Sequence, residues 1–175
     1  LYWDEVSLGY NAYSILKTAK DEHGKFLPIT NFAAFGDYKP PGYIYFTVPS
    51  VGVFGLNEFA VRFPSALAGT LAVVLTYFLT QKLFSKRKIA LLASFFLAIS
   101  PWNIHFSRVA FEANFAALFS LIGIYLFVKF AKDKGFWIIP SALFFILAVN
   151  TYTSQRLFVP FILIVLLIQF RKQVF

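Results

Sequence analysis

The chain has 175 residues, 59% of them hydrophobic, with a net charge of +8 and neither cysteine nor methionine. Its mean hydropathy of +0.69 indicates an integral membrane protein, because only about half of the residues of an ordinary soluble domain are apolar. The composition excludes a disulfide framework and a cysteine-ligated metal site, and the bases cap apolar segments instead of forming the surface stripe typical of nucleic-acid binding.

The first 25 residues predict an amphipathic helix that lies on the membrane surface. Its end is expected within residues 21–25, where Gly24 suits a C-terminal cap. Apolar and polar side chains are expected on opposite faces: the apolar face has Leu8, Ala12, Ile15, Leu16 and Ala19, and the polar face has Asn11, Ser14 and Thr18.

Asp4 and Glu5 open this segment, and two interpretations of the pair stay open. Asp is a favoured N-cap and Glu in the first turn suits the helix dipole, so the pair could simply start the helix. A carboxylate held at the membrane surface beside a group that orients it is also suited to act as a general base.

Residues 26–42 are expected to form a loop, because prolines and glycines punctuate them. Within it, Pro40 and Pro41 fix the backbone after Lys39 and push the lysine into an extended conformation. A rigidly presented ammonium suits a lipid phosphate, whereas a solvated lysine before a turn is the ordinary alternative.

The apolar stretch 43–54 is too short to cross a bilayer and is expected to be interfacial or re-entrant. Asn57 should then cap a helix that has Glu58 in its first turn. Pro64 is expected to bend the entry into the first full span.

Five apolar segments predict membrane spans, most of them close to the ~20 residues that a bilayer core requires. The last one is short and carries Pro160, so it should extend at both ends or tilt. The five are residues 65–84, 88–104, 114–130, 136–151 and 157–170.

The charges predict which side each connection faces. Nine bases against the single acid Asp133 fall in two alternate connections and at the C-terminus: Lys82, Lys86, Arg87, Lys88, Lys129, Lys132, Lys134, Arg171 and Lys172. Because basic short loops stay in the cytoplasm, residues 1–64, 104–113 and 152–156 should face outward.

The two short outward connections carry candidate binding residues. Arg108 and Glu112, four residues apart, could pair on one helix face. Arg156 offers the fork geometry that phosphate prefers, with Tyr152 nearby, or else it anchors the interface.

The sequence therefore predicts an all-α integral membrane fold. Residues 1–64 would form an outward-facing first loop with amphipathic interfacial helices, and 65–175 a polytopic helical bundle of about five transmembrane helices. Because it begins at Leu1 on an outward acidic motif, with no crossing segment before it, we expect this sequence to belong to a longer protein.

Several motifs in this order resemble a known family. They are Asp4-Glu5, Lys39-Pro40-Pro41, residues 55–67 (GLNEFAVRFPSAL), residues 99–102 (ISPW), and Ser107-Arg108 followed by Glu112. The whole chain resembles the N-terminal portion of a membrane glycosyltransferase of the GT-C fold. It is most similar to the protein mannosyltransferase and aminoarabinose transferase group, which uses polyprenyl-phosphate sugars.

This resemblance implies an inverting sugar transfer on the extracytoplasmic face, in a plasma membrane of prokaryotic type. It implies that Asp4 is the catalytic acid of the first loop with Glu5 beside it, that Lys39 contacts the lipid phosphate, and that Glu112 is a second acid where the family often has Asp. Three arginines (Arg62, Arg108 and Arg156) and Tyr152 are further candidates for binding the phosphate or the sugar.

The implied partners are a polyprenyl-phosphate-linked sugar donor, membrane lipid, and a protein, lipid or glycan acceptor, with no nucleic acid. The sequence identifies no cofactor and leaves a divalent metal open. Two other classes also stay open: a fragment of a secondary transporter or lipid flippase, and a non-catalytic membrane scaffold. Transport is disfavoured, because the centres of the predicted spans lack acids and bases.

Overall fold

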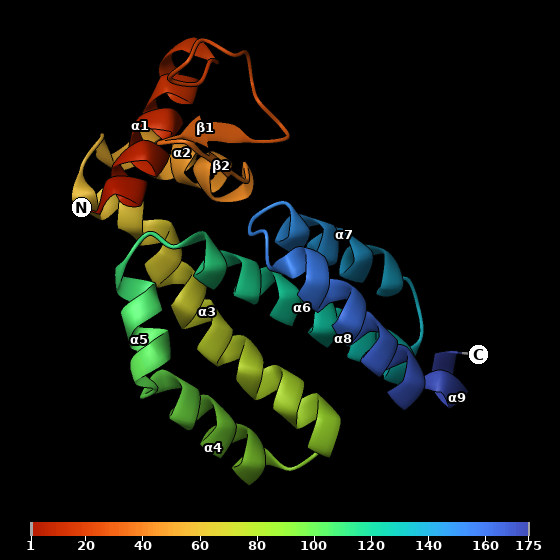
Figure 1. Ribbon diagram of the computed structural model, residues 1–175. Helices are drawn as coiled ribbons and strands as arrows, with labels where there is room; N and C mark the ends of the chain where they lie inside the picture. Colours follow the sequence, from red (N-terminus) through yellow and green to blue (C-terminus); the bar gives the residue numbers. More distant parts are fainter. Residues whose placement is uncertain (1, 175) are drawn as a thin grey trace.

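The computed structural model describes residues 2–174 and is built mainly from helices (Figure 1). The N-terminal part consists of α1 (Trp3–Thr18), the strands β1 (Phe32–Ala34) and β2 (Asp37–Lys39), and α2 (Gly42–Phe54). The bundle that follows consists of α3 (Glu58–Phe84), α4 (Arg87–Ala98), α5 (Pro101–Arg108), α6 (Glu112–Asp133), α7 (Ile138–Val149), α8 (Gln155–Gln169) and α9 (Arg171–Val174).

Leu8, Ala12 and Ile15 share one face of α1, as predicted, but this face lies in the protein core instead of on the membrane surface, because α1 packs against α2 and α3. Two details of the predicted faces were wrong. Asn11 is fully buried, because it lies three residues after Leu8 on the same face, and its amide donates to Glu22 Oε1 at 2.8 Å. Leu16 is exposed.

The predicted end of α1 was also wrong. The helix stops at Thr18, with Ala19 as its C-cap in the left-handed region at φ 57°. Gly24 belongs instead to a separate turn, in which its N–H donates to the carbonyl of Asp21.

Residues 26–42 are not simply a loop, because they contain a short antiparallel hairpin in which Phe32 pairs with Lys39. Buried Phe32 and Ala34 hold it against the helices. The turn residues Phe35 and Gly36 have φ values of 50° and 82°, the positive sign at both positions that a tight two-residue hairpin turn needs. The hairpin fixes where Lys39 lies.

Helix α2 begins shortly after the hairpin. Its first residue, Gly42, is hydrogen-bonded to the end of α7, because its N–H donates to the carbonyl of Asn150 at 3.1 Å. At its other end, Asn57 caps α3 by accepting from Ala60 N at 2.9 Å, which confirms the predicted cap. Pro64 lies inside α3, in its second turn, and the helix continues through it.

Among residues 2–174, two helices, α3 and α6, are long and apolar enough to cross a membrane. The predicted span 88–104 was wrong as a single helix: α4 ends at Ala98, α5 starts at Pro101, and the pair is bent by 54°. Counted together they make a third candidate span. Helices α7 and α8 are apolar but shorter, so the count of five spans stays a prediction.

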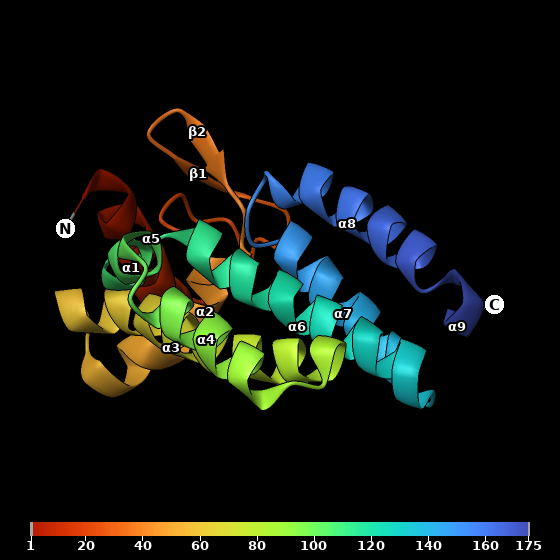
Figure 2. The ribbon, with the colours of Figure 1, turned by 90° about the horizontal axis from the view of Figure 1, so that it is seen from below.

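The basic connections gather at one end of the bundle, which we call the basic end (the α3–α4 and α6–α7 connections and α9). Lys82 Nζ lies 2.7 Å from Asp133 Oδ1, and Lys134 contacts the carbonyl of Gln173. The N-terminal part covers the opposite end of the molecule in both ribbon views (Figures 1 and 2).

Candidate active site

Three segments far apart in the sequence meet around the ammonium of Lys39. Its Nζ lies 2.9 Å from Asp4 Oδ1 and 4.0 Å from Glu112 Oε1. The side chains of Lys39 and Glu112 are 12% and 9% exposed, whereas that of Asp4 is 51% exposed. The cluster of Asp4, Lys39 and Glu112 is therefore buried on one side and open to a substrate at Asp4.

Asp4 is the second residue of α1, and the cap of this helix is Tyr2. The interpretation of Asp4 as an N-cap was therefore wrong. Its carboxylate lies in the first turn, where the helix dipole favours an anion, and it pairs with Lys39 instead of a backbone N–H.

Lys39 ends β2, and Pro40 and Pro41 lead from it directly into α2. Asp37 lies two residues earlier, on the same face of the strand, and its charge acts on the lysine. Asp37 was not among the predicted site residues, although the two-residue period of a strand would have indicated it.

Burial of Lys39 disfavours its charge, but the hydrogen bond to Asp4 and the charge of Glu112 outweigh that effect and raise its pKa above the ordinary value. The side chain is therefore a permanent cation at neutral pH. Glu112 supports it from the first residue of α6.

Glu5, predicted beside Asp4, is fully buried, and both of its carboxylate oxygens accept hydrogen bonds. Oε1 accepts from Arg62 Nε at 2.7 Å and from Ala110 N at 2.8 Å, while Oε2 accepts from Arg62 Nη2 at 2.7 Å and from Tyr2 N at 2.8 Å. Burial raises the pKa of Glu5, yet these hydrogen bonds lower it overall to about 2. The ionised carboxylate thus joins α1, α3 and the α5–α6 connection.

Among residues 2–174, the remaining predicted site residues make no contact with the cluster of Asp4, Lys39 and Glu112. The expected pair of Arg108 and Glu112 does not form, because Val109 is extended and separates α5 from α6. Arg156 is exposed in the first turn of α8, and Tyr152 is half-buried just before that helix. Arg62 is held by Glu5 and Glu58.

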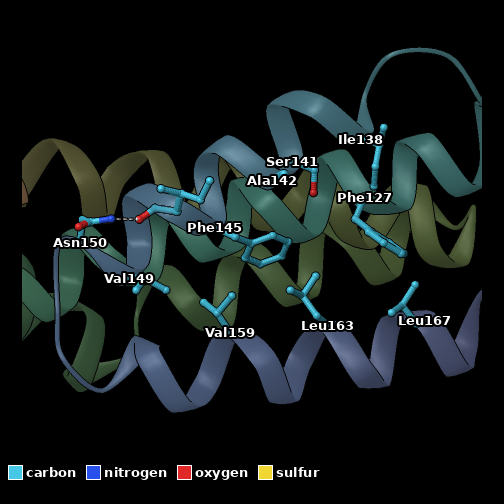
Figure 3. A pocket seen from close by; sticks show the side chains of 11 residues that line it. Phe127, Ile138, Ser141, Ala142, Phe145, Val149, Asn150, Val159, Leu163 and Leu167 are labelled. Carbon is cyan, nitrogen blue, oxygen red and sulfur yellow. Dashed lines mark hydrogen bonds between the residues drawn. The ribbon is translucent and has the colours of Figure 1, made fainter.

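A separate apolar groove of about 460 Å³ runs between α7 and α8, with Phe127 of α6 at one end (Figure 3). No acid or base lines it, and its polar side chains are satisfied: Ser141 donates to the carbonyl of Gly123, and Asn150 to that of Ile146. Its other end, at Asn150, contacts Gly42, three residues after Lys39. The apolar lining suits a hydrocarbon chain, and its Asn150 end is joined to the start of α2.

Within the described part of the chain, no group of three or more His, Cys, Asp or Glu side chains could hold a metal ion.

A family model and a relative of this chain both name mannosyltransferases. The model of the dolichyl-phosphate-mannose-protein mannosyltransferase family matches residues 38–175. A Bacillus subtilis (strain 168) protein described as "Putative mannosyltransferase YkcB" is 32% identical over 157 residues, which cover 89% of this chain and 22% of that protein. An uncharacterized protein of Aquifex aeolicus (strain VF5) is 29% identical over 143 residues, which cover 75% of this chain and 29% of that protein.

The chain thus spans between a fifth and a third of the length of these two relatives. No solved structure matches it.

Proposed function

This chain belongs to the dolichyl-phosphate-mannose-protein mannosyltransferase family, and we propose that the protein is a membrane glycosyltransferase that moves a sugar from a polyprenyl phosphate to an acceptor hydroxyl. The observation that carries the proposal is the cluster in which a buried ammonium, Lys39, lies between an open carboxylate, Asp4, and an enclosed one, Glu112.

In the proposed reaction, Asp4 is the general base. It accepts the proton of the acceptor hydroxyl while that oxygen bonds to the anomeric carbon of the sugar. The bond from this carbon to the phosphate oxygen breaks on the opposite side, and its electron pair stays on the phosphate. The configuration at the anomeric carbon is inverted.

Lys39 is proposed to bind the departing phosphate, where negative charge develops as the bond breaks. Its raised pKa supports this role, because the side chain stays charged through the reaction. Glu112 would orient Lys39, and the buried pair of Glu5 and Arg62 would fix the first turn of α1 that carries Asp4.

The lipid part of the donor is proposed to lie in the apolar groove between α7 and α8. The groove begins where Asn150 contacts Gly42, close to Lys39, and continues toward the basic end (Figure 3). A phosphate at Lys39 and a chain in the groove would place the reacting carbon beside Asp4.

The reaction is proposed to occur on the extracytoplasmic face of a plasma membrane of prokaryotic type. The nine bases at and near the basic end support a cytoplasmic position for that end, and the cluster lies at the other. The acceptor is proposed to be a hydroxyl of a protein, lipid or glycan, and the family name supports the first of these.

Sugar transfer by the full chain in proteoliposomes tests this function. Mannose labelled with tritium is offered either on polyprenyl phosphate or on a nucleoside diphosphate, together with hydroxyl acceptors of each class. Transfer from the lipid donor alone is expected. Transfer from the nucleotide sugar, or none from the lipid donor in a folded protein, would contradict the proposal, and the second outcome would favour a transporter or a scaffold.

A further inference from the structure

A second groove, unrelated to the charged cluster, lies where the broken span α4–α5 faces α3. It measures about 450 Å³, and none of Asp4, Lys39 or Glu112 lines it. The 54° bend between α4 and α5 turns α5 against α3 (Figure 1). Its walls are Ala66, Gly69, Thr70, Val73, Val74, Ala98, Asn103, Ile104, Ser107 and Arg108.

Close packing of α5 on α3 holds these walls in place. A Cβ atom on Gly69 would lie 1.8 Å from Ser107 Oγ, so only glycine allows this approach. One turn earlier, Ser65 donates to the carbonyl of Phe106 at 2.9 Å. The groove is therefore a formed feature of the fold rather than a gap between loosely placed helices.

Two polar side chains in the lining, an exposed Arg108 and a half-buried Asn103, lack a protein partner among the residues described. The guanidinium of Arg108 makes no ion pair or hydrogen bond there, because Glu112 lies against Lys39 instead. The side-chain amide of Asn103, five residues earlier on α5, is also without a partner in the described chain. No acid lines the groove, so Arg108 gives its lining a net positive charge.

We propose that this groove binds a membrane phospholipid with an anionic headgroup. The phosphate would be held by the fork of Arg108 and by the Asn103 amide. One acyl chain would run along Val73, Val74 and Ile104, which form the apolar part of the groove. Val74 is about half exposed, so the chain can enter sideways from the bilayer.

A phospholipid fits this place better than the sugar donor does. In the function proposed above, the donor's phosphate binds at the charged cluster, whose three residues are absent from the lining. A bound phospholipid would instead neutralise Arg108 and cover the backbone at the break between α4 and α5. The choice of a phospholipid over the donor rests on the proposed function, whereas phospholipid binding itself can be measured without sugar transfer.

Native mass spectrometry of the full chain in detergent tests the site with phosphatidylglycerol, diacylglycerol and inorganic phosphate as separate probes. Only phosphatidylglycerol should stay bound, because it alone supplies both the phosphate and the chains. Arg108→Ala should lower its occupancy about tenfold, the effect of losing a charge-assisted hydrogen bond. Arg171→Ala is the matched control, an exposed arginine outside the groove, and should change nothing.

A second pair of variants tests the apolar part and guards against misfolding of the Arg108 variant. Val74→Trp should fill the groove and displace the lipid, whereas Leu71→Trp, on the same helix and similarly exposed but outside the lining, should not. Equal retention in all four variants overturns the site. The proposal would also be overturned if equimolar polyprenyl phosphate displaced phosphatidylglycerol from the wild type but not from Arg108→Ala. That result would assign the groove to the donor.

Discussion

Glu5 and Arg62 are 57 residues apart in the chain and form a two-pronged ion pair, with Nε and Nη2 of the arginine each 2.7 Å from a different carboxylate oxygen. The backbone N–H of Ala110 donates to the same carboxylate. One buried anion thus fixes the first turn of α1, and with it Asp4, relative to α3 and the start of α6.

Replacing Glu5 by Gln should destabilise the protein by about 3–5 kcal/mol, the cost of breaking a buried ion pair from one side. The expected readout is thermal unfolding in detergent. Because the pKa of Glu5 is lowered from 4.5 to about 2, its contribution is complete above pH 4.5 and is lost as the pH falls toward 2. The difference in stability between wild type and variant should shrink over that range.

Glu58→Gln is the control for this prediction, because Glu58 pairs with the same arginine from an exposed position. Its effect should be below about 1 kcal/mol, as for other surface pairs. Equal destabilisation by the two substitutions would refute a special role for Glu5.

Asp4→Asn should lower turnover by roughly 10²–10⁴ while the protein stays folded, because an amide cannot accept the proton of the acceptor. The measurement is the rate of sugar transfer at saturating donor. Asp37→Asn, on the same face of β2 as Lys39, keeps the cluster's carboxylates intact and should have a small effect. Near-normal turnover in a folded Asp4→Asn protein would show that Asp4 is not the general base.

Lys39→Ala should raise the KM for the lipid donor about 10–100-fold, the range expected for loss of a charge-assisted phosphate contact. Lys39→Arg should retain part of the affinity, because it keeps the charge. Inhibition by polyprenyl phosphate without sugar should weaken in parallel. Lys25→Ala, an exposed lysine outside the cluster, serves as control, and an unchanged KM in Lys39→Ala would remove the assignment.

Gly42→Ala should destabilise the fold by about 1–3 kcal/mol, the usual cost of overpacking. Its new Cβ would lie 2.2 Å from Thr151 Oγ1 and 2.8 Å from Thr151 Cα, so the start of α2 must move and take Lys39 with it. Gly52→Ala in the same helix meets only Leu16 methyl groups at 3.8 Å and should be neutral or stabilising. Indistinguishable melting curves for the two variants would show that this contact is not tight.

Single cysteines should report which side each end of the bundle faces, since the chain has none of its own. We expect Arg87→Cys and Lys132→Cys to be protected from a membrane-impermeant maleimide in intact cells. Lys25→Cys and Arg156→Cys should react. Labelling of the first pair would reverse the proposed sidedness and with it the site of the reaction.

Local signals in the sequence predicted those features that depend on neighbouring residues. Asn57 starts α3 because a short polar side chain precedes an apolar run, and Lys39 stands at an extended position because Pro40 follows it. Pro101 could also have indicated the break in the span 88–104, because proline favours the first turn of a helix.

Features that depend on distant contacts could not be predicted in this way. Glu5 gains its role from Arg62 and Ala110, and no spacing in the sequence connects these residues. The hairpin was missed because its strands have three residues each and its turn carries Phe35 where Asn or Gly is the usual signal. The four-residue spacing of Arg108 and Glu112 predicts a pair only within a continuous helix, and extended Val109 removes that condition.

The cluster around Lys39 also has an order of assembly. As the chain leaves the ribosome, Asp4 and Lys39 emerge long before Glu112, so their ion pair can form while α6 is still being synthesised. Arg62, which binds Glu5, is also synthesised before α6, whereas Ala110, whose N–H donates to the same carboxylate, directly precedes that helix. The cluster is therefore complete only when α6 is present, and a nascent chain that stalls before α6 would carry Asp4 and Lys39 without the second carboxylate.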